Sequence, residues 1–203
     1  MMQSSKALKV ISTPTGIYAL LTAALKQPPL LAAMGTTDDR GMSRVRMMML
    51  RGLDEKRQAI MTCADARGAK LKQIHRQPRG ELCVWFPANR IQIRFLVEWK
   101  IFVWQEGRRD RNAANRLIDK WWQAMSSESR ELYGKPWPGK PRDRRGAKPF
   151  SKSLWDIKKP PPTYALLCGV IKSIDALALS TPKHVRHWHQ RRGNTWRSQR
   201  INP

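Results

Sequence analysis

The stretch that decides the fold is Ser43-Arg44-Val45-Arg46-Met47-Met48-Met49-Leu50-Arg51-Gly52. Polar and apolar residues alternate at its start, which is the period of a β-strand, and the run then becomes wholly apolar. We therefore expect a strand over Ser43 to Leu50 whose far end is buried on both faces. Arg46 and Arg51 bracket the apolar run, which suits a ligand with a flat apolar body and an anionic tail. The alternative is a buried core strand with charged ends.

Further strands are predicted on both sides of this stretch. A short apolar segment over 30–37 precedes it, separated by a turn at 38–41, and three more strands are expected over 59–63, 81–86 and 89–105. Leu71, Ile74 and His75 predict a short helix between the first and second of these later segments, ending before Pro78. The central piece is thus predicted as a four- or five-stranded antiparallel meander with one inserted helix, in the shape of a small barrel.

The flanks of this barrel carry other patterns. Apolar spacing predicts a helix over 16–27 and another over 108–133, whose buried stripe would be Ala113, Leu117, Trp121 and Ala124. A strand is expected over 164–179 with a bend at 172–173, followed by a hairpin over 185–202 that turns at 192–194. We interpret the chain as one domain over 1–203, divided into a barrel core (14–104), a helix with a basic Pro-rich loop (105–162) and C-terminal strands (163–203).

The charge of the chain is its most unusual property. Lys and Arg number 39 against 15 Asp and Glu, which gives a formal net charge of +24. Such a balance predicts attraction to nucleic acid, anionic lipid or phosphorylated ligands. The loop over 134–159 contains nine Lys or Arg and two Asp, and the segment after Asp175 has no acidic residue. A specific polyanion surface would require the cations of loop and tail to meet, whereas evenly spread charge is the more usual outcome.

Metal and disulfide chemistry are not indicated. The three cysteines are too few and too scattered for a disulfide framework, and no CxxC pair suggests zinc: Cys63, Cys83 and Cys168. His184, His187 and His189 lie among arginines and are interpreted as a surface cluster. The sequence shows no membrane span and no signal peptide, so we expect a cytoplasmic protein in a reducing compartment.

A second motif, Thr62-Cys63-Ala64-Asp65-Ala66-Arg67-Gly68-Ala69-Lys70, joins a strand to a helix. The N–H groups and dipole at a helix N-terminus bind phosphate. Arg67 and Lys70 are three positions apart, which would place both on the same side of the helix. The alternative is a loop with ordinary surface cations.

A third motif is Asn89-Arg90-Ile91-Gln92-Ile93-Arg94. In an alternating strand Gln92 lies on the face opposite Ile91 and Ile93. Its amide can both donate and accept hydrogen bonds, as the edge of a flavin ring requires. A solvent-facing glutamine is the alternative.

These three motifs, in this order, resemble the pyridoxamine 5′-phosphate oxidase-like FMN-binding split barrels, in particular their cyanobacterial and plant branch. Three further segments carry the resemblance: Gly35 to Gly41, Gly80 to Pro87, and Trp137-Pro138-Gly139-Lys140-Pro141-Arg142. The resemblance implies a β-dominated α+β fold, an FMN-binding split β-barrel with flanking helices. It also implies a homodimer with FMN in the interface.

The resemblance further implies a set of cofactor-binding residues. Arg46 and Lys70, with Arg67 and Thr62, would hold the FMN phosphate, and Gln92 and Arg186 would reach the ring. The strand over 47–50 would line the flavin ring and the ribityl chain. The full set is Arg46, Met47, Met48, Met49, Leu50, Arg51, Met61, Thr62, Arg67, Lys70, Gln92 and Arg186.

The predicted function is therefore that of an FMN-binding flavoprotein, an oxidoreductase whose substrate the sequence does not name. True oxidases carry Arg-x-His-x-Arg near the C-terminus, and this chain reads Pro182-Lys183-His184-Val185-Arg186. FMN binding is accordingly the prediction, rather than the named oxidase activity. The alternative from another class is a basic split-barrel module that binds nucleic acid or another polyanion without flavin catalysis.

Overall fold

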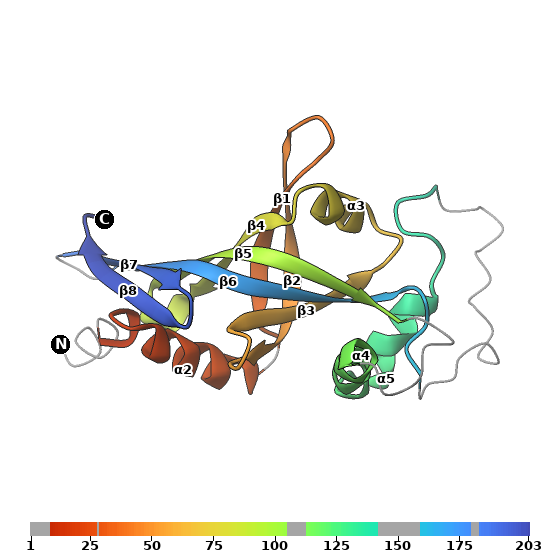
Figure 1. The fold of residues 1–203 in the computed structure, drawn as a ribbon, viewed down its shortest axis with the longest axis horizontal. Coiled ribbons are helices and arrows are strands. Elements are labelled where there is room, and N and C mark those ends of the chain that lie inside the picture. Colours follow the sequence, from red (N-terminus) through yellow and green to blue (C-terminus); the bar gives the residue numbers. More distant parts are fainter. Residues whose placement is uncertain (1–8, 28, 105–112, 142–158, 180–182) are drawn as a thin grey trace.

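The structure is a computed structural model that describes residues 9–27, 29–104, 113–141, 159–179 and 183–203 (Figure 1). Its helices are α2 (Pro14–Leu25), α3 (Ala69–Arg76), α4 (Ala113–Gln123) and α5 (Ser127–Glu131), with 3₁₀ turns η1 (Pro87–Asn89) and η2 (Leu132–Gly134). Its strands are β1 (Leu31–Thr37), β2 (Ser43–Asp54), β3 (Ala59–Asp65), β4 (Arg79–Phe86), β5 (Ile91–Val103), β6 (Tyr164–Ala178), β7 (Val185–Arg192) and β8 (Thr195–Ile201).

Six antiparallel strands close into a barrel. Their order is β3-β2-β1-β4-β5-β6, and β6 pairs back with β3. Residues 164–170 of β6 pair with β3, whereas residues 173–178 pair with β7, so the sheet divides along this one strand. The ribbon β7–β8 extends away from the barrel (Figure 1). The predicted β-dominated split barrel with flanking helices is confirmed.

The order of the strands differs from the predicted meander. β4 pairs with β1 and not with β3, because α3 carries the chain from β3 across to the far edge of β1. The barrel also needs β6, which lies some sixty residues after β5 in the sequence and pairs along its whole length. Local alternation predicts the strands but contains no information on this distant partner.

The expectation that the far end of β2 is buried on both faces is wrong. Met48 and Leu50 point into the barrel and are buried, but Met47 is 59% exposed. β2 is hydrogen-bonded to β1 on one edge and β3 on the other, so one of its faces lines the interior and the other lies on the outside of the barrel. The apolar run at 47–50 therefore supplies side chains both to the barrel interior and to its outer surface.

Two apolar cores hold the fold together. The first fills the barrel and includes Ile17 and Leu21 from α2, which covers the barrel. The second lies between the outside of β3 and β6 and the helix α4. In it Trp122, Tyr133 and Tyr164 pack edge to face with ring centroids 5.0–5.9 Å apart. Aromatic pairs prefer this geometry over face-to-face stacking.

The predicted 108–133 helix is interrupted. Residues 105–112 lie outside the described residues, α4 ends at Gln123, and α5 begins after Ser126, whose side chain caps it. The predicted buried stripe is also wrong by one position: α4 buries Asn115, Ile118 and Trp122. The large Trp122 ring fits the aromatic cluster, and this contact sets the rotation of the helix.

Other local predictions are confirmed. β6 carries an irregularity at Lys172, because Leu96 pairs with Ser173 and the next residue of β5 pairs with Ile171. The C-terminal hairpin turns at Gly193, which has φ +60°. Glycine adopts this left-handed conformation without the steric cost that other residues meet.

Gly52 allows a close contact between β2 and α4. A Cβ atom at this position would lie 2.1 Å from the Trp121 ring, well inside van der Waals distance. The packing of Trp121 against β2 therefore requires a residue without a side chain at position 52.

Candidate functional site

The β1–β2 hairpin and α3 bring two cations together. Arg46 lies on β2 opposite Met34 of β1, and Lys70 lies in the first turn of α3. Both side chains are half-buried. Burial lowers the pKa of both side chains. Arg44 lowers the pKa of Arg46 further, and Arg46 does the same to Lys70. These two residues are called the Arg46–Lys70 pair below.

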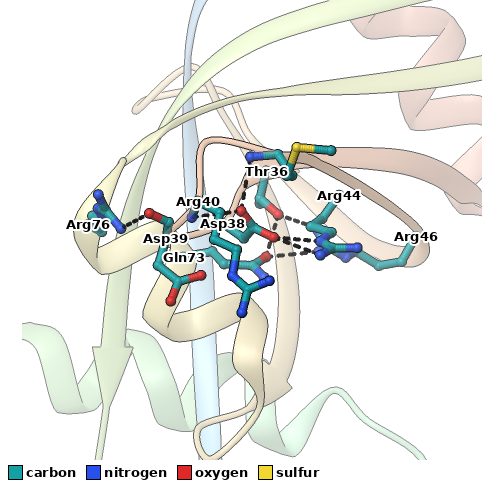
Figure 2. A network of polar contacts seen from close by, with 9 residues as sticks. Thr36, Asp38, Asp39, Arg40, Arg44, Arg46, Gln73 and Arg76 are labelled. Atoms are coloured by element: carbon teal, nitrogen blue, oxygen red, sulfur yellow. Dashed lines mark hydrogen bonds and ion pairs between the residues drawn. The ribbon is translucent and has the colours of Figure 1, made fainter.

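Among the residues that the structure describes, Arg46 is held by neutral acceptors alone (Figure 2). Its guanidinium donates to the Thr36 hydroxyl, to the Gln73 Oε1 atom at 2.9 Å and to the Met34 carbonyl at 3.4 Å. The Thr36 hydroxyl in turn donates to Gln73 Oε1 at 2.7 Å. Burial, followed by the charge of Arg44, lowers the pKa of Arg46. The positive charge of Arg46 is therefore oriented but not neutralised.

Lys70 has even fewer partners. In the described part of the chain, its ammonium forms no hydrogen bond and no ion pair. Burial lowers its pKa first and Arg46 lowers it further, while Asp65 and Cys63 act in the opposite direction. The start of α3 adds to this, since Gly68 provides no side-chain cap and the first turn holds no acidic residue. A half-buried cation beside an uncapped helix N-terminus favours an anionic ligand.

Arg67 does not lie on α3, because the helix begins at Ala69, and its expected helical relation to Lys70 is wrong. Its guanidinium forms two hydrogen bonds to the Asp65 carboxylate, of 2.9 and 2.6 Å, and a third to the Lys135 carbonyl at 2.9 Å. It also lies 5.8 Å from the centre of the Trp137 ring. The hydrogen bond to Asp65 raises the pKa of Arg67. Among the described residues, only its Nη1 atom keeps donors without a protein acceptor.

The remaining residues of the first two motifs are mostly inside the protein. Met48, Leu50 and Met61 are core residues, and Thr62 is fully buried. The Thr62 hydroxyl donates to the Met49 carbonyl at 2.7 Å, which ties β3 to β2 beside the site.

Arg51 points toward the second core. Its Nε atom is buried and has no partner among the described residues. Burial raises the pKa of both Tyr133 and Tyr164, and the charge of Arg51 opposes this rise. Arg51 thus lies close to these phenols of the second core.

Met47, Met49 and Gln92 share the outer face of the barrel. Gln92 is half-buried and pairs with Trp85 of β4 and Leu177 of β6, as its predicted orientation away from Ile91 requires. Leu177 in turn pairs with Arg186 of β7, so Gln92 and Arg186 lie on one continuous face.

Arg186 is fixed in an ion-pair network. It donates twice to the Asp175 carboxylate, at 2.8 and 2.7 Å, and Arg94 bonds the same carboxylate. Burial alone would raise the pKa of Asp175, but the hydrogen bonds from both arginines outweigh it and leave the pKa lowered. The network holds Arg186 in a defined place on the face that carries Gln92.

The predicted histidine surface cluster needs a correction. His189 is fully buried and its ring nitrogens contact the Ser198 hydroxyl at 2.8 Å and the Ile11 carbonyl at 2.9 Å. Burial lowers the pKa of His189, so the ring is neutral at pH 7. It ties the C-terminal ribbon to the segment before α2. No group of three or more potential metal ligands occurs in the described ranges.

The basic loop and tail are separate in the described part of the chain. Residues 142–158, with most of the predicted loop cations, lie outside it. Figure 1 places the segment after α5 and the β7–β8 ribbon at opposite ends of the molecule. Lys135 and Lys140 therefore lie far from the tail arginines, and polyanion binding stays a prediction. Within the described ranges, no helix is both long and apolar enough to span a membrane.

Three residues of the site were not predicted from the sequence: Thr36, Gln73, and Asp65 in its role as the partner of Arg67. Thr36 is a buried hydroxyl in an otherwise apolar strand. Gln73 lies three positions after Lys70, on the same side of α3. Both features are present in the sequence, but only the folded structure shows that Thr36 and Gln73 contact Arg46.

Known proteins are similar to this chain in sequence and fold. Residues 18–103 match the family described as pyridoxamine 5′-phosphate oxidase, FMN-binding domain. The solved structure of a pyridoxamine 5′-phosphate oxidase-related, FMN-binding protein from Nostoc punctiforme PCC 73102 is 27% identical and superimposes with a TM-score of 0.79. The match covers 96% of this chain and 100% of that one. The chain has the fold of the pyridoxamine 5′-phosphate oxidase-like split barrels.

Two further known proteins are similar to this chain. Pyridoxine/pyridoxamine 5′-phosphate oxidase 2 of Arabidopsis thaliana is 27% identical over 161 residues, which are 78% of this chain and 79% of that protein. PhzG from Burkholderia lata 383, solved with tetrahydrophenazine-1-carboxylic acid, has a TM-score of 0.73 at 16% identity and shares the fold alone. It covers 95% of this chain and 93% of its own. The family supports an FMN-binding, oxidoreductase-type protein.

Proposed function

We propose that this split barrel binds FMN and acts as a flavin-dependent oxidoreductase on a substrate that is not yet identified. One observation carries the proposal. The Arg46–Lys70 pair holds two half-buried positive charges, and no carboxylate of the described residues bonds either of them. A phosphate placed between them would supply the missing negative charge and accept charge-assisted hydrogen bonds.

The surrounding donors fit a phosphate. The uncapped N-terminus of α3 offers backbone N–H groups, and Arg67 keeps its Nη1 donors. Thr62, also predicted to bind the phosphate, is fully buried in the middle of β3 and donates its hydroxyl to the Met49 carbonyl, so the proposed phosphate ligands are Arg46, Lys70 and Arg67. The donor set is cationic and rich in N–H groups, and so suits a phosphate better than a metal ion.

The flavin ring would lie along β2 on the outer face. In this proposal the side chains of Met47 and Met49 line the ring and ribityl chain, with Arg51 beside them. Met48, Leu50 and Met61, whose side chains are buried in the two cores, can contribute only their backbone groups. The amide of Gln92 and the guanidinium of Arg186 meet the ring edge, and Asp175 holds Arg186 in position. FMN, when bound, supplies the electron-transfer chemistry, and these side chains orient it.

The outer face also supports a homodimer. Val45, Met47, Trp85 and Leu96 are 71%, 59%, 46% and 41% exposed, which is unusual for side chains of this size. They stand on β2, β4 and β5, and exposed apolar patches of this kind mark interaction sites. We infer that a second copy covers this face, as the family resemblance suggests.

The three free cysteines fit a reducing, cytoplasmic location, which is part of the proposal. Cys63 and Cys168 are buried and Cys83 is half-buried. Burial raises the pKa of Cys83 and of Cys168, which leaves both as unreactive thiols.

The direct test is the absorbance spectrum of the purified full chain, with mass spectrometry of any chromophore released by denaturation. The proposal predicts flavin bands and the mass of FMN. Protein that is colourless as purified and does not take up FMN when it is added at saturating concentration contradicts it.

A further inference from the structure

The arginines of the candidate site have two kinds of partner, a carboxylate or a neutral amide. Arg44 is paired with the Asp38 carboxylate at 2.8 Å, and Arg67 is paired with Asp65 at 2.6 Å. Arg46, two residues after Arg44 on β2, instead donates to an amide oxygen, Gln73 Oε1, at 2.9 Å. Its neighbours are thus locally neutralised, whereas Arg46 is not.

The orientation of the Gln73 amide is fixed by its partners. Arginine can only donate hydrogen bonds, so the amide atom that faces it must be the carbonyl oxygen. The Thr36 hydroxyl accepts from Arg46 and donates to the same oxygen. Figure 2 shows this closed set of contacts between Arg46, Thr36 and Gln73. A glutamate at position 73 would have the same shape but would add a negative charge.

We propose that Gln73 is a specificity-determining residue, whose neutral amide positions Arg46 while leaving the charge of the Arg46–Lys70 pair free for a phosphate. This inference rests on the proposed FMN function and names what the site selects: the phosphorylated flavin over riboflavin. Lys70 contributes to the same selection from one turn earlier on α3.

Two substitutions at Gln73 separate this role from a structural one. Gln73→Glu should form an ion pair with Arg46, and we expect FMN affinity to fall about 10- to 100-fold while riboflavin affinity changes less than about twofold. The same variant should raise the melting temperature of the flavin-free protein, because it relieves the repulsion within the Arg46–Lys70 pair. Gln73→Leu removes the acceptor, so it should lower FMN affinity and also lower the melting temperature.

Gln77→Glu is the matched control. Gln77 is exposed at the C-terminal end of the same helix and is not a partner of Arg46, yet the substitution adds the same charge. We expect its FMN to riboflavin affinity ratio to stay within about threefold of the wild-type ratio, since exposed charges are screened.

The experiment titrates flavin-free, full-length protein with FMN and with riboflavin at fixed salt, and follows flavin fluorescence. A selective loss of FMN affinity in Gln73→Glu, with a more stable flavin-free protein, supports the inference. An unchanged ratio in a wild-type background that binds FMN overturns the inference alone. A parallel fall in both affinities overturns it as well, because Gln73 would then support the flavin body. If the wild-type protein binds neither flavin, the proposed function fails and the inference fails with it.

Discussion

Replacing Lys70 by methionine should make the flavin-free protein more stable and its FMN complex weaker. Methionine keeps an apolar stem of similar length and removes only the ammonium. In the folded chain that ammonium is half-buried beside Arg46 and has no hydrogen-bond or ion-pair partner among the described residues. Its charge therefore costs folding free energy.

The pH dependence follows from the lowered pKa of Lys70, which burial and Arg46 cause. The unfolded chain holds this proton up to about pH 10.4, so a lowered folded-state pKa means that unfolding takes up a proton as the pH approaches that value. The penalty is full at pH 7 and decreases as the pH rises from the folded-state pKa of Lys70 toward the unfolded-state value of about 10.4. The stability advantage of Lys70→Met should therefore be present at pH 7 and shrink toward pH 10.

The effect on binding has the opposite sign. A hydrogen bond from the Lys70 ammonium to a phosphate contributes about 1.5–3 kcal/mol, which is about 10- to 150-fold in Kd. The assay pairs urea denaturation of the flavin-free protein with fluorescence titration of FMN. Lys72→Met is the control, because Lys72 lies on the exposed side of α3. A Lys70→Met protein that is less stable and binds FMN as tightly as the wild type would refute the reasoning.

Three other predictions concern the frame of the site. Gly52→Ala should destabilise the protein by about 1–3 kcal/mol in thermal or urea unfolding, because the new methyl group collides with Trp121, whereas Gly35→Ala, whose nearest contact would be 3.7 Å away, should cost less than about 1 kcal/mol. Asp175→Asn should lower the free energy of unfolding by about 2 kcal/mol at pH 7, and the difference should vanish as the pH falls below about 4 and through the lowered pKa of this carboxylate; a pH-independent difference would contradict this. Met47→Glu should convert the proposed dimer into a monomer in sedimentation velocity, and an unchanged dimer would exclude this face as the interface.

Much of the fold was predictable because its strands carry local signals. The alternation of β5 and the glycine turn of the C-terminal hairpin could be read directly from the sequence. The pairing of β6 with both β3 and β5 could not, because it joins residues that are far apart in the sequence, such as Asp65 with Tyr164 and Val103 with Ala165. The same limit explains why the burial of Met47 was predicted wrongly: a strand period does not say which face meets the barrel interior.

The candidate site divides in the same way. Arg46 and Lys70 were predicted from a strand and a helix start, and the structure brings them together. Arg67 was given the wrong geometry because the helix begins two residues later than the spacing argument assumed. Gln73 and Thr36 were missed because their importance lies in a contact across two elements, which no local pattern contains.

The most direct test of the central claim is the relative affinity of the flavin-free, wild-type chain for FMN and riboflavin, measured by isothermal titration calorimetry at low salt. The two ligands differ only in the phosphate that the Arg46–Lys70 pair is proposed to bind. We predict one FMN per chain and a preference for FMN of at least about 100-fold that decreases as salt is added. Equal affinities for the two flavins, or a preference that salt does not change, would contradict the assignment of this pair as the phosphate site.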